Sequence, residues 1–279
     1  MNNQSNNGYL KFWGVRGTFP ITSASHSKYG GNTSCIELMC GDHLIIFDAG
    51  TGLKVLGDTL LAQKKTIKAD MLISHTHLDH ILGIPFFKPF YASSHQFRLW
   101  AGHLQPERLL KDVLSNMMTE PFFPIPIDIF KADIVYNDFM PKDILHLSEN
   151  IKVVTTSLNH PNRAIGYRVN YNNLSICYVT DTEHQTDEQN AHILKLIQNA
   201  DYFIYDATYT DNEFELHRHW GHSSWQEGHR LAKEANVKNY IIFHHDPDHD
   251  DQFMDKIALE ASSLNPNTIV AYEGLKIEF

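Results

Sequence analysis

Four potential metal ligands fall within six residues of one short segment. Residues 75–80 read His-Thr-His-Leu-Asp-His and directly follow an apolar run with the pattern of a strand. Side chains at a strand end alternate with period two, so His75 and His77 should project to the same side. Asp79 and His80 follow where the chain turns into a helix and should point to a second position. The segment therefore predicts two adjacent ligand sets that other residues complete, because such metals take about four to six ligands.

The composition of the chain points in the same direction. Histidine makes up 18 of 279 residues, and 33 acidic residues against 23 Lys and Arg give a net charge of −10. Imidazole is the commonest metal ligand in proteins. The acidic balance argues against a large nucleic-acid partner, because that binding rests on basic surface. Three cysteines without a Cys-x-x-Cys pair exclude a disulfide scaffold and a thiolate zinc cluster.

The N-terminal residues and the lengths of the apolar runs indicate the cellular compartment of the protein. No apolar run reaches the ~18 to 20 residues that cross a bilayer. The N-terminus is rich in Asn and has neither the basic start nor the apolar stretch of a secretory signal. We therefore expect a cytoplasmic protein without a membrane partner, with a disordered tail over residues 1–8 and a single domain over residues 9–279.

Strands and helices alternate along the chain in two halves of similar rhythm, which argues for an α/β architecture. The stretch 85–142 breaks this rhythm with seven prolines and many aromatic residues. We expect an insertion there, either a lid over the mouth of the domain or an irregular packed loop, with a helix near 107–118. Elsewhere helices are expected at 53–62 and 223–235, and strands at 9–13, 34–39, 43–48, 69–74, 151–157, 165–170, 174–180, 202–206, 239–244 and 268–272.

A family resemblance joins these observations. His-x-His-x-Asp-His after a strand resembles the signature of the metallo-β-lactamase fold hydrolases, from about residue 9 to residue 275. The resemblance implies a four-layer αββα sandwich built from two βαβ-type halves, here with an inserted lid region. It also implies two divalent metals, zinc first and manganese or iron as alternatives. The implied ligands are His75, His77 and His160 for the first metal, Asp79, His80 and His244 for the second, and Asp181 as the bridge between them.

Two residues near these ligands take supporting roles in the same resemblance. Asp48 ends a strand and would orient the metal histidines through hydrogen bonds. The pair His244-His245 follows another strand, and either histidine could close the second site. We expect His244 as the ligand, because the family places the ligand first after the apolar run, and His245 then lies behind the ligands.

Two segments resemble ribonuclease Z and the cyclic phosphodiesterases of this fold. Gly221-His222-Ser223-Ser224 matches a Gly-His-Ser-Thr segment whose histidine contacts the scissile phosphate and assists the leaving oxygen. Asp206-Ala207-Thr208 matches a Glu-Ala-Thr segment whose carboxylate orients that histidine, although Asp206 is one methylene shorter. The resemblance implies catalytic roles for His222 and Asp206 beside Asp79. Ser223 could bind substrate, or one of the two serines could cap the following helix.

The glycine-rich N-terminal segments resemble those of phosphoribosyl cyclic phosphodiesterases and cyclic-nucleotide phosphodiesterases. Arg16 lies in Val-Arg-Gly-Thr-Phe-Pro and could pair with a substrate phosphate, while Asn32 could steady the loops of the metal site and counts with Arg16 as a candidate substrate-binding residue. Glycine-rich loops allow backbone N–H groups to approach an anion. The alternative is that these glycines only form a tight hairpin and that Arg16 belongs to a structural ion pair.

The predicted activity is hydrolysis of a phosphodiester. Two metals with a bridging aspartate hold a hydroxide that would attack phosphorus, so the expected substrate is a small cyclic or linear nucleotide-like phosphodiester. Ribonuclease Z grips transfer RNA with a long basic arm, and no such excursion is present in the sequence. A lactonase or thioesterase of the same fold and a non-catalytic metal-stabilised sensing module remain alternatives. The oligomeric state stays open, including a homodimer.

Overall fold

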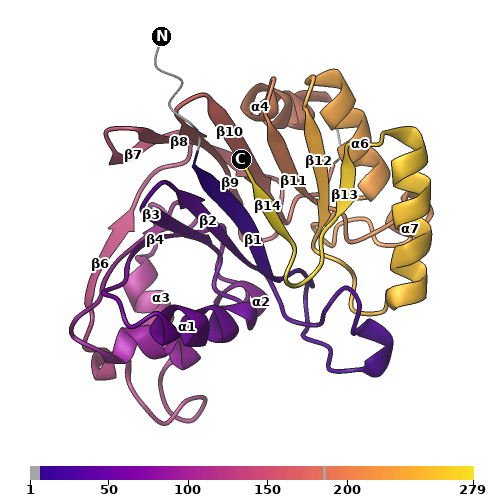
Figure 1. Ribbon diagram of the computed structural model, residues 1–279. Helices are drawn as coiled ribbons and strands as arrows, with labels where there is room; N and C mark the ends of the chain where they lie inside the picture. Colours follow the sequence, from indigo (N-terminus) through magenta and orange to yellow (C-terminus); the bar gives the residue numbers. More distant parts are fainter. Residues whose placement is uncertain (1–6, 185–186) are drawn as a thin grey trace.

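Two seven-stranded β-sheets lie face to face in the computed structural model, which describes residues 7–184 and 187–279 (Figure 1). The first sheet has the order β14 (Lys276–Glu278), β1 (Gly8–Gly14), β2 (Cys35–Cys40), β3 (His43–Phe47), β4 (Lys68–Ile73), β5 (Gln96–Ala101) and β6 (Asp133–Asp138). The second has the order β13 (Thr268–Val270), β12 (Asn239–Phe243), β11 (Tyr202–Asp206), β10 (Leu174–Val179), β9 (Ala164–Tyr171), β8 (Ile151–Leu158) and β7 (Ile144–Ser148).

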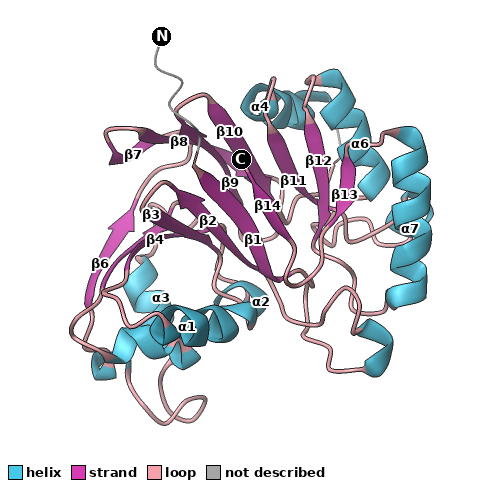
Figure 2. Cartoon of the chain, in the orientation of Figure 1, coloured by secondary structure: helices cyan, strands magenta, loops and turns pink. Residues whose placement is uncertain are grey.

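Helices cover the outer face of each sheet (Figure 2). α1 (Gly52–Ala62) and α3 (Leu110–Met117) pack on the first sheet, and α4 (Asp187–Ile197), α6 (Trp225–Glu234) and α7 (Asp251–Leu264) pack on the second. A third core, which includes Phe12, Tyr167 and Ile241, fills the space between the two sheets. The predicted four-layer αββα sandwich is confirmed.

The parallel strands explain where polar side chains can gather. β3, β4, β5 and β6 run parallel to one another, as do β10, β11, β12 and β13. Strands of this kind are covered on both faces and read as apolar runs, and all six residues of β10 are buried. Because parallel strands end at the same edge, the residues that follow them come together there, where ligands bind in open α/β sheets.

The stretch 85–142 is part of the first sheet. β5 and β6 lie within it. β5 pairs in parallel with β4, β6 pairs in parallel with β5, and α3 packs over them. The expectation of an irregular insertion or a lid is therefore wrong for these strands. Proline-rich connections on both sides of each strand hid them, and only the segment after β5 borders a cavity near the ligands.

Several other expectations differ from the structure. Residues 1–6 of the tail expected at 1–8 lie outside the described residues, and Gly8 already begins β1. α4, α7, β7 and β14 have no counterpart among the expected elements, and the acidic run before α7 ends in Asp250, whose side chain caps that helix. Within the described residues, no helix combines the length and the apolar character needed to cross a membrane.

Candidate metal centre

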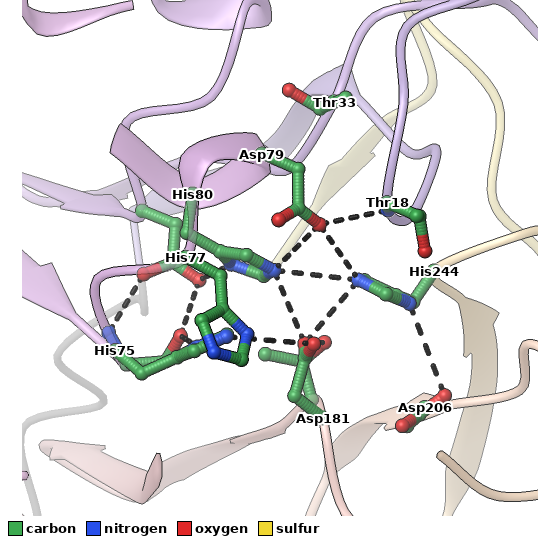
Figure 3. A network of polar contacts seen from close by, with 12 residues as sticks. Thr18, Thr33, His75, His77, Asp79, His80, Asp181, Asp206 and His244 are labelled. Carbon is green, nitrogen blue, oxygen red and sulfur yellow. Dashed lines mark hydrogen bonds and ion pairs between the residues drawn. The ribbon is translucent and has the colours of Figure 1, made fainter. Parts of the chain in front are cut away.

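The seven expected ligands come together at the carboxyl ends of the parallel strands. Six of them are labelled in Figure 3, where their side chains point toward one another. They form two adjacent sets, and the ligand atoms within each set lie within 4.8 Å of one another. The sets are His75, His77 and His160, and Asp79, His80, Asp181 and His244.

Strand ends and one short helix position these ligands. His75 follows β4 by two residues, and α2 (Leu78–Ile81) then carries Asp79 and His80 on its first turn. Asp181 and His244 follow β10 and β12 and adopt positive φ angles of 54° and 62°, as does Asp48 after β3, at 55°. Left-handed backbone is costly for residues other than glycine and clusters at functional sites. Three such bends at one edge turn these side chains into the space between the sheets.

Hydrogen bonds behind the imidazoles fix which nitrogen faces the cluster. His80 donates from Nδ1 to Asp48 at 2.8 Å, and His160 donates from Nδ1 to the carbonyl of Gly221 at 2.7 Å. The Nδ1 atom of His244 lies 2.9 Å from Thr208 Oγ1. In each ring the Nε2 atom is therefore left for the cluster, which is the arrangement that outer hydrogen bonds give to metal-binding histidines.

Ring nitrogens and carboxylates meet closely inside the cluster. His80 Nε2 lies 3.3 Å from His244 Nε2 and 3.2 Å from Asp181 Oδ2 (Figure 3). His160 Nε2 lies 3.0 Å from His77 Nδ1, and His75 Nε2 is buried without a hydrogen-bond partner among the described residues. A buried polar atom without a partner is costly. A cation between these atoms would satisfy them together.

The charges of the cluster also call for a cation. Asp79 and Asp181 are buried, and within the described residues the only side chains that form ion pairs with their carboxylates are histidines. Burial opposes the charge of Asp181, but the neighbouring His244 and His80 hold its pKa well below the usual range. Burial lowers the pKa of His75 well below its usual value, which favours the neutral imidazole that binds metals. This donor set of imidazole nitrogens and carboxylate oxygens suits zinc, manganese or iron.

Asp48 holds the first half of the cluster in place. Its carboxylate accepts hydrogen bonds from the Ser74 backbone at 2.7 Å, the Ser74 hydroxyl at 2.8 Å and the Tyr178 hydroxyl at 2.6 Å, besides that of His80. All these groups are buried. Asp48 thus links β3, β4, α2 and the second sheet at one point, and it orients His80 as the resemblance implies.

His244 and His245 have different surroundings. His244 points into the cluster, whereas His245 Nε2 lies 2.8 Å from the carbonyl of Ala271 and its ring packs edge-on against Tyr29. Burial lowers the pKa of His245 to about 3. Among the described residues His245 makes no hydrogen bond to a candidate ligand, so it supports the strand end rather than a ligand directly.

His222 lies beside the cluster with Asp206 behind it. His222 Nδ1 is 3.1 Å from Asp206 Oδ2 and 3.8 Å from Asp181 Oδ1, and its ring stacks on His244 with centroids 5.0 Å apart. Burial lowers the pKa of His222, but the charge and hydrogen bond of Asp206 outweigh it and raise this pKa to about 9. The shorter carboxylate therefore still reaches the histidine.

Arg16 does not face the cluster. Its guanidinium is fully buried and donates to three backbone carbonyls, those of Gly30 at 2.7 Å, Asp246 at 3.0 Å and His249 at 2.7 Å. The side chain joins the N-terminal loop to the loop after β12. Its expected pairing with a substrate phosphate is wrong, because no part of the guanidinium is exposed.

Asn32 and Ser223 are also occupied within the chain. Asn32 donates from both its backbone and its side chain to Glu273, at 2.6 and 2.9 Å. Ser223 is fully buried, and its hydroxyl accepts a hydrogen bond from Tyr205 at 2.9 Å. The structure does not place these side chains where substrate could bind. The neighbouring Ser224 caps α6, which is the alternative role expected for this pair.

Two contacts to this region have no counterpart in the sequence analysis. The backbone N–H of Thr18 donates to Asp79 Oδ2 at 2.8 Å, so the glycine-rich N-terminal loop reaches a candidate ligand through its backbone (Figure 3). His103 is buried two residues after β5, with Nε2 3.0 Å from Thr76 Oγ1. Its position after a parallel strand is the same signal that marks the ligands.

Comparison with known proteins places the chain among relatives of one kind. Residues 43–245 match a family model described as the beta-lactamase superfamily domain. A ribonuclease Z from Brevibacillus brevis is 33% identical over 88 residues, which are 30% of this chain and 28% of that protein. The chain thus spans under a third of the length of that relative. A ribonuclease Z from Phocaeicola vulgatus is 24% identical over 284 residues, with 85% of this chain and 88% of that protein covered.

Solved structures share the fold at lower sequence identity. The metallo-beta-lactamase fold protein YhfI from Bacillus subtilis superposes with a TM-score of 0.74 at 19% identity, covering 99% of this chain and all of the other. A structure described as a new diphosphatase from the PhnP family gives a TM-score of 0.69 at 17% identity, covering 98% of this chain and 97% of the other. These likenesses agree with the four-layer arrangement.

Proposed function

Because the chain belongs to the β-lactamase superfamily, we propose that it is a dinuclear metal-dependent hydrolase of a small nucleotide-like phosphodiester, cyclic or linear. The proposed ligands are His75, His77 and His160 for one metal and Asp79, His80 and His244 for the other, with Asp181 between them. Zinc is the expected metal, with manganese or iron as alternatives. The relatives named ribonuclease Z support phosphodiester chemistry.

The observation that carries this proposal is the His222–Asp206 pair beside the cluster. Asp206 accepts from Thr182 N, Thr208 N and the Thr208 hydroxyl, so its carboxylate cannot turn away from His222. His222 donates from Nδ1 to Asp206, which directs Nε2 away from that carboxylate. A histidine held by a carboxylate in this way is suited to proton transfer. Phosphodiester cleavage needs such a donor, because the leaving alkoxide is a strong base.

The side chains divide the work of the reaction. Bound divalent cations would lower the pKa of water and neutralise charge on the phosphoryl oxygens. Water that has lost a proton to the solvent would add to phosphorus, the bond to the leaving oxygen would break, and His222 would donate its Nε2 proton to that oxygen. Asp206 would stabilise the charged imidazole before this transfer, and the Thr18 N–H would hold Asp79 in its orientation.

The surface cations favour a small substrate over a long nucleic acid. Lys88 pairs with Asp58, Arg98 with the buried Asp70, and Arg163 with Glu107. A nucleic-acid grip needs cations that can contact phosphates along a path. Lys88 and Arg98 of the stretch 85–142, and Arg163 near the cluster, are thus engaged with acids and are not free to follow a nucleic-acid backbone.

The test is hydrolysis of a 2′,3′-cyclic nucleotide, whose leaving oxygen is an alkoxide, by the His222→Ala variant loaded with zinc. We expect a loss of ~10² to 10⁴ in kcat, the usual contribution of general acid catalysis, with unchanged metal content. His146→Ala is the matched control, since His146 is exposed on β7 and away from the cluster. Full activity of His222→Ala with intact metal content would overturn the role of His222. Faster turnover of a thioester or lactone than of any phosphodiester would overturn the proposed reaction.

A further inference from the structure

A cavity of about 560 Å³ opens beside the candidate metal centre, on the side of His75 and His77. Its outer wall comes from the loop between β5 and α3, with Glu107 and Arg108, and from Arg163 in the loop that follows His160. A substrate whose phosphodiester lies at the cluster would extend into this space. The groups of the wall therefore bear on which substrates fit.

The wall carries one cation that the protein does not neutralise. Arg163 is committed, because it pairs with Glu107 at 2.7 Å and donates to the carbonyl of Gln105 at 2.8 Å. Arg108 also lines the cavity, and its exposed side chain forms no hydrogen bond or ion pair with another described residue. In a chain with a net charge of −10, an unpaired cation beside a cavity indicates that the cavity can receive an anionic group.

The floor of the cavity adds hydrogen-bonding capacity below Arg108. His103 lines it and is 3% exposed, and its Nδ1 atom has no partner among the described residues. Thr76 and Asn162 line the same space, while Leu104 and Val113 give it an apolar side. This mixture suits a ligand with a charged end and a less polar body, such as a sugar phosphate.

We propose that this cavity binds a second phosphate group of the substrate, which Arg108 recognises. The inference rests on the proposed function and names its substrate class, a phosphodiester that carries a further phosphate. Arg presents several N–H donors in a planar fork that matches phosphate oxygens. The Arg163–Glu107 pair holds the wall in place, so Arg108 can meet the ligand without competition from Glu107.

The test compares two substrates that differ only in the second phosphate. Thymidine 5′-(p-nitrophenyl phosphate) carries the phosphodiester alone, and its 3′-phosphorylated form adds the second group. For the zinc-loaded wild type we expect the added phosphate to raise kcat/KM about tenfold, mainly through KM, as one charge-assisted hydrogen-bonded pair would give. In Arg108→Gln the two substrates should be cleaved with similar kcat/KM, and the unphosphorylated one as in the wild type.

A charge-matched variant and a binding measurement complete the test. Lys111→Gln removes the same charge from an exposed position on α3 that does not line the cavity, and should keep the preference. Calorimetry with thymidine 3′,5′-bisphosphate and thymidine 5′-phosphate should show the same tenfold preference, abolished in Arg108→Gln, without any turnover. Preserved binding preference without cleavage of either substrate would contradict the proposed function alone. Cleavage or binding without preference, no binding of the bisphosphate, or equal effects of both variants would overturn the Arg108 site.

Discussion

Strand β4 connects two buried clusters built around aspartate. Near its start, Asp70 accepts hydrogen bonds from His43 at 2.7 Å, Arg98 at 2.6 Å and Trp100 at 2.7 Å. Just past its end, His75 enters the cluster of candidate ligands around Asp181. Both carboxylates are about equally buried, with side chains 2% exposed. The two ends of one strand thus offer the same acid in two environments.

The partners of the two carboxylates make the difference. Asp70 faces a permanent cation and an indole donor, so burial raises its pKa but these partners outweigh it and hold the pKa below its usual value. Asp181 accepts a hydrogen bond from the Thr180 hydroxyl at 2.6 Å, but among the described residues its ion-pair partners are all imidazoles, and one of these, His75, has a buried nitrogen without a hydrogen-bond partner. A buried acid with all its hydrogen bonds made is structural. A buried acid among incompletely bonded imidazoles has the surroundings of a metal site.

The largest expected effect separates the two clusters by activity. Asp181→Asn should reduce phosphodiester hydrolysis by ~10³-fold or more, because the proposed bridging ligand is worth several kcal/mol in the transition state. Asp70→Asn should leave kcat/KM of the zinc-loaded protein within about twofold. The measurement is hydrolysis of bis(p-nitrophenyl) phosphate by both variants. Equal losses in the two variants would show that Asp70 and Asp181 do not differ in their role in hydrolysis.

A smaller effect should appear in stability, with the order of the variants reversed. Asp70→Asn leaves Arg98 and the Trp100 N–H without the charged, buried carboxylate that accepts their hydrogen bonds, and should lower the free energy of unfolding by about 2 to 4 kcal/mol. In the metal-free protein, Asp181→Asn should lower the free energy of unfolding by less, because it removes a buried negative charge from a cluster that has no permanent cation. Urea unfolding of the metal-free proteins checks this. A metal-free Asp181→Asn less stable than Asp70→Asn would contradict it.

The smallest effect concerns pH. The pKa of Asp70 is lower in the folded protein than its ordinary value, so its contribution is present above the unfolded pKa and is lost as pH falls through the folded pKa. The difference in unfolding free energy between the wild type and Asp70→Asn should therefore shrink steadily below about pH 4. Urea titrations at several pH values measure it. A difference that stays constant down to pH 2 would show that the charge of Asp70 does not stabilise the fold.

The same contrast explains which features the sequence could predict. Four candidate ligands were predictable because they are dense in residues 75–80, and the family resemblance implied His160, Asp181 and His244, each of which follows a strand. The positive φ angles of Asp181 and His244 could not be predicted, because nothing in these residue types indicates a left-handed backbone. His103 also follows a parallel strand, but the Pro-rich flanks of β5 concealed that strand.

The substrate-binding expectations failed for a physical reason. Arg16 is held by carbonyls of Asp246 and His249, more than 200 residues along the chain, and Asn32 is held by Glu273. Such partners come together only when the two halves pack. Arg108 was not expected to bind substrate, yet it lines the cavity. That it lacks a partner among the described residues becomes visible only once the positions of the neighbouring acids are known.

The most direct test of the account is removal and return of the metal in the wild type. The protein is stripped with a chelator and titrated with zinc, while metal content and hydrolysis of bis(p-nitrophenyl) phosphate are followed together. We predict that the stripped protein is inactive and still folded, and that activity returns and saturates near two metals per chain. Full hydrolysis by the stripped protein, or loading to two metals without hydrolysis of any phosphodiester, would contradict the account.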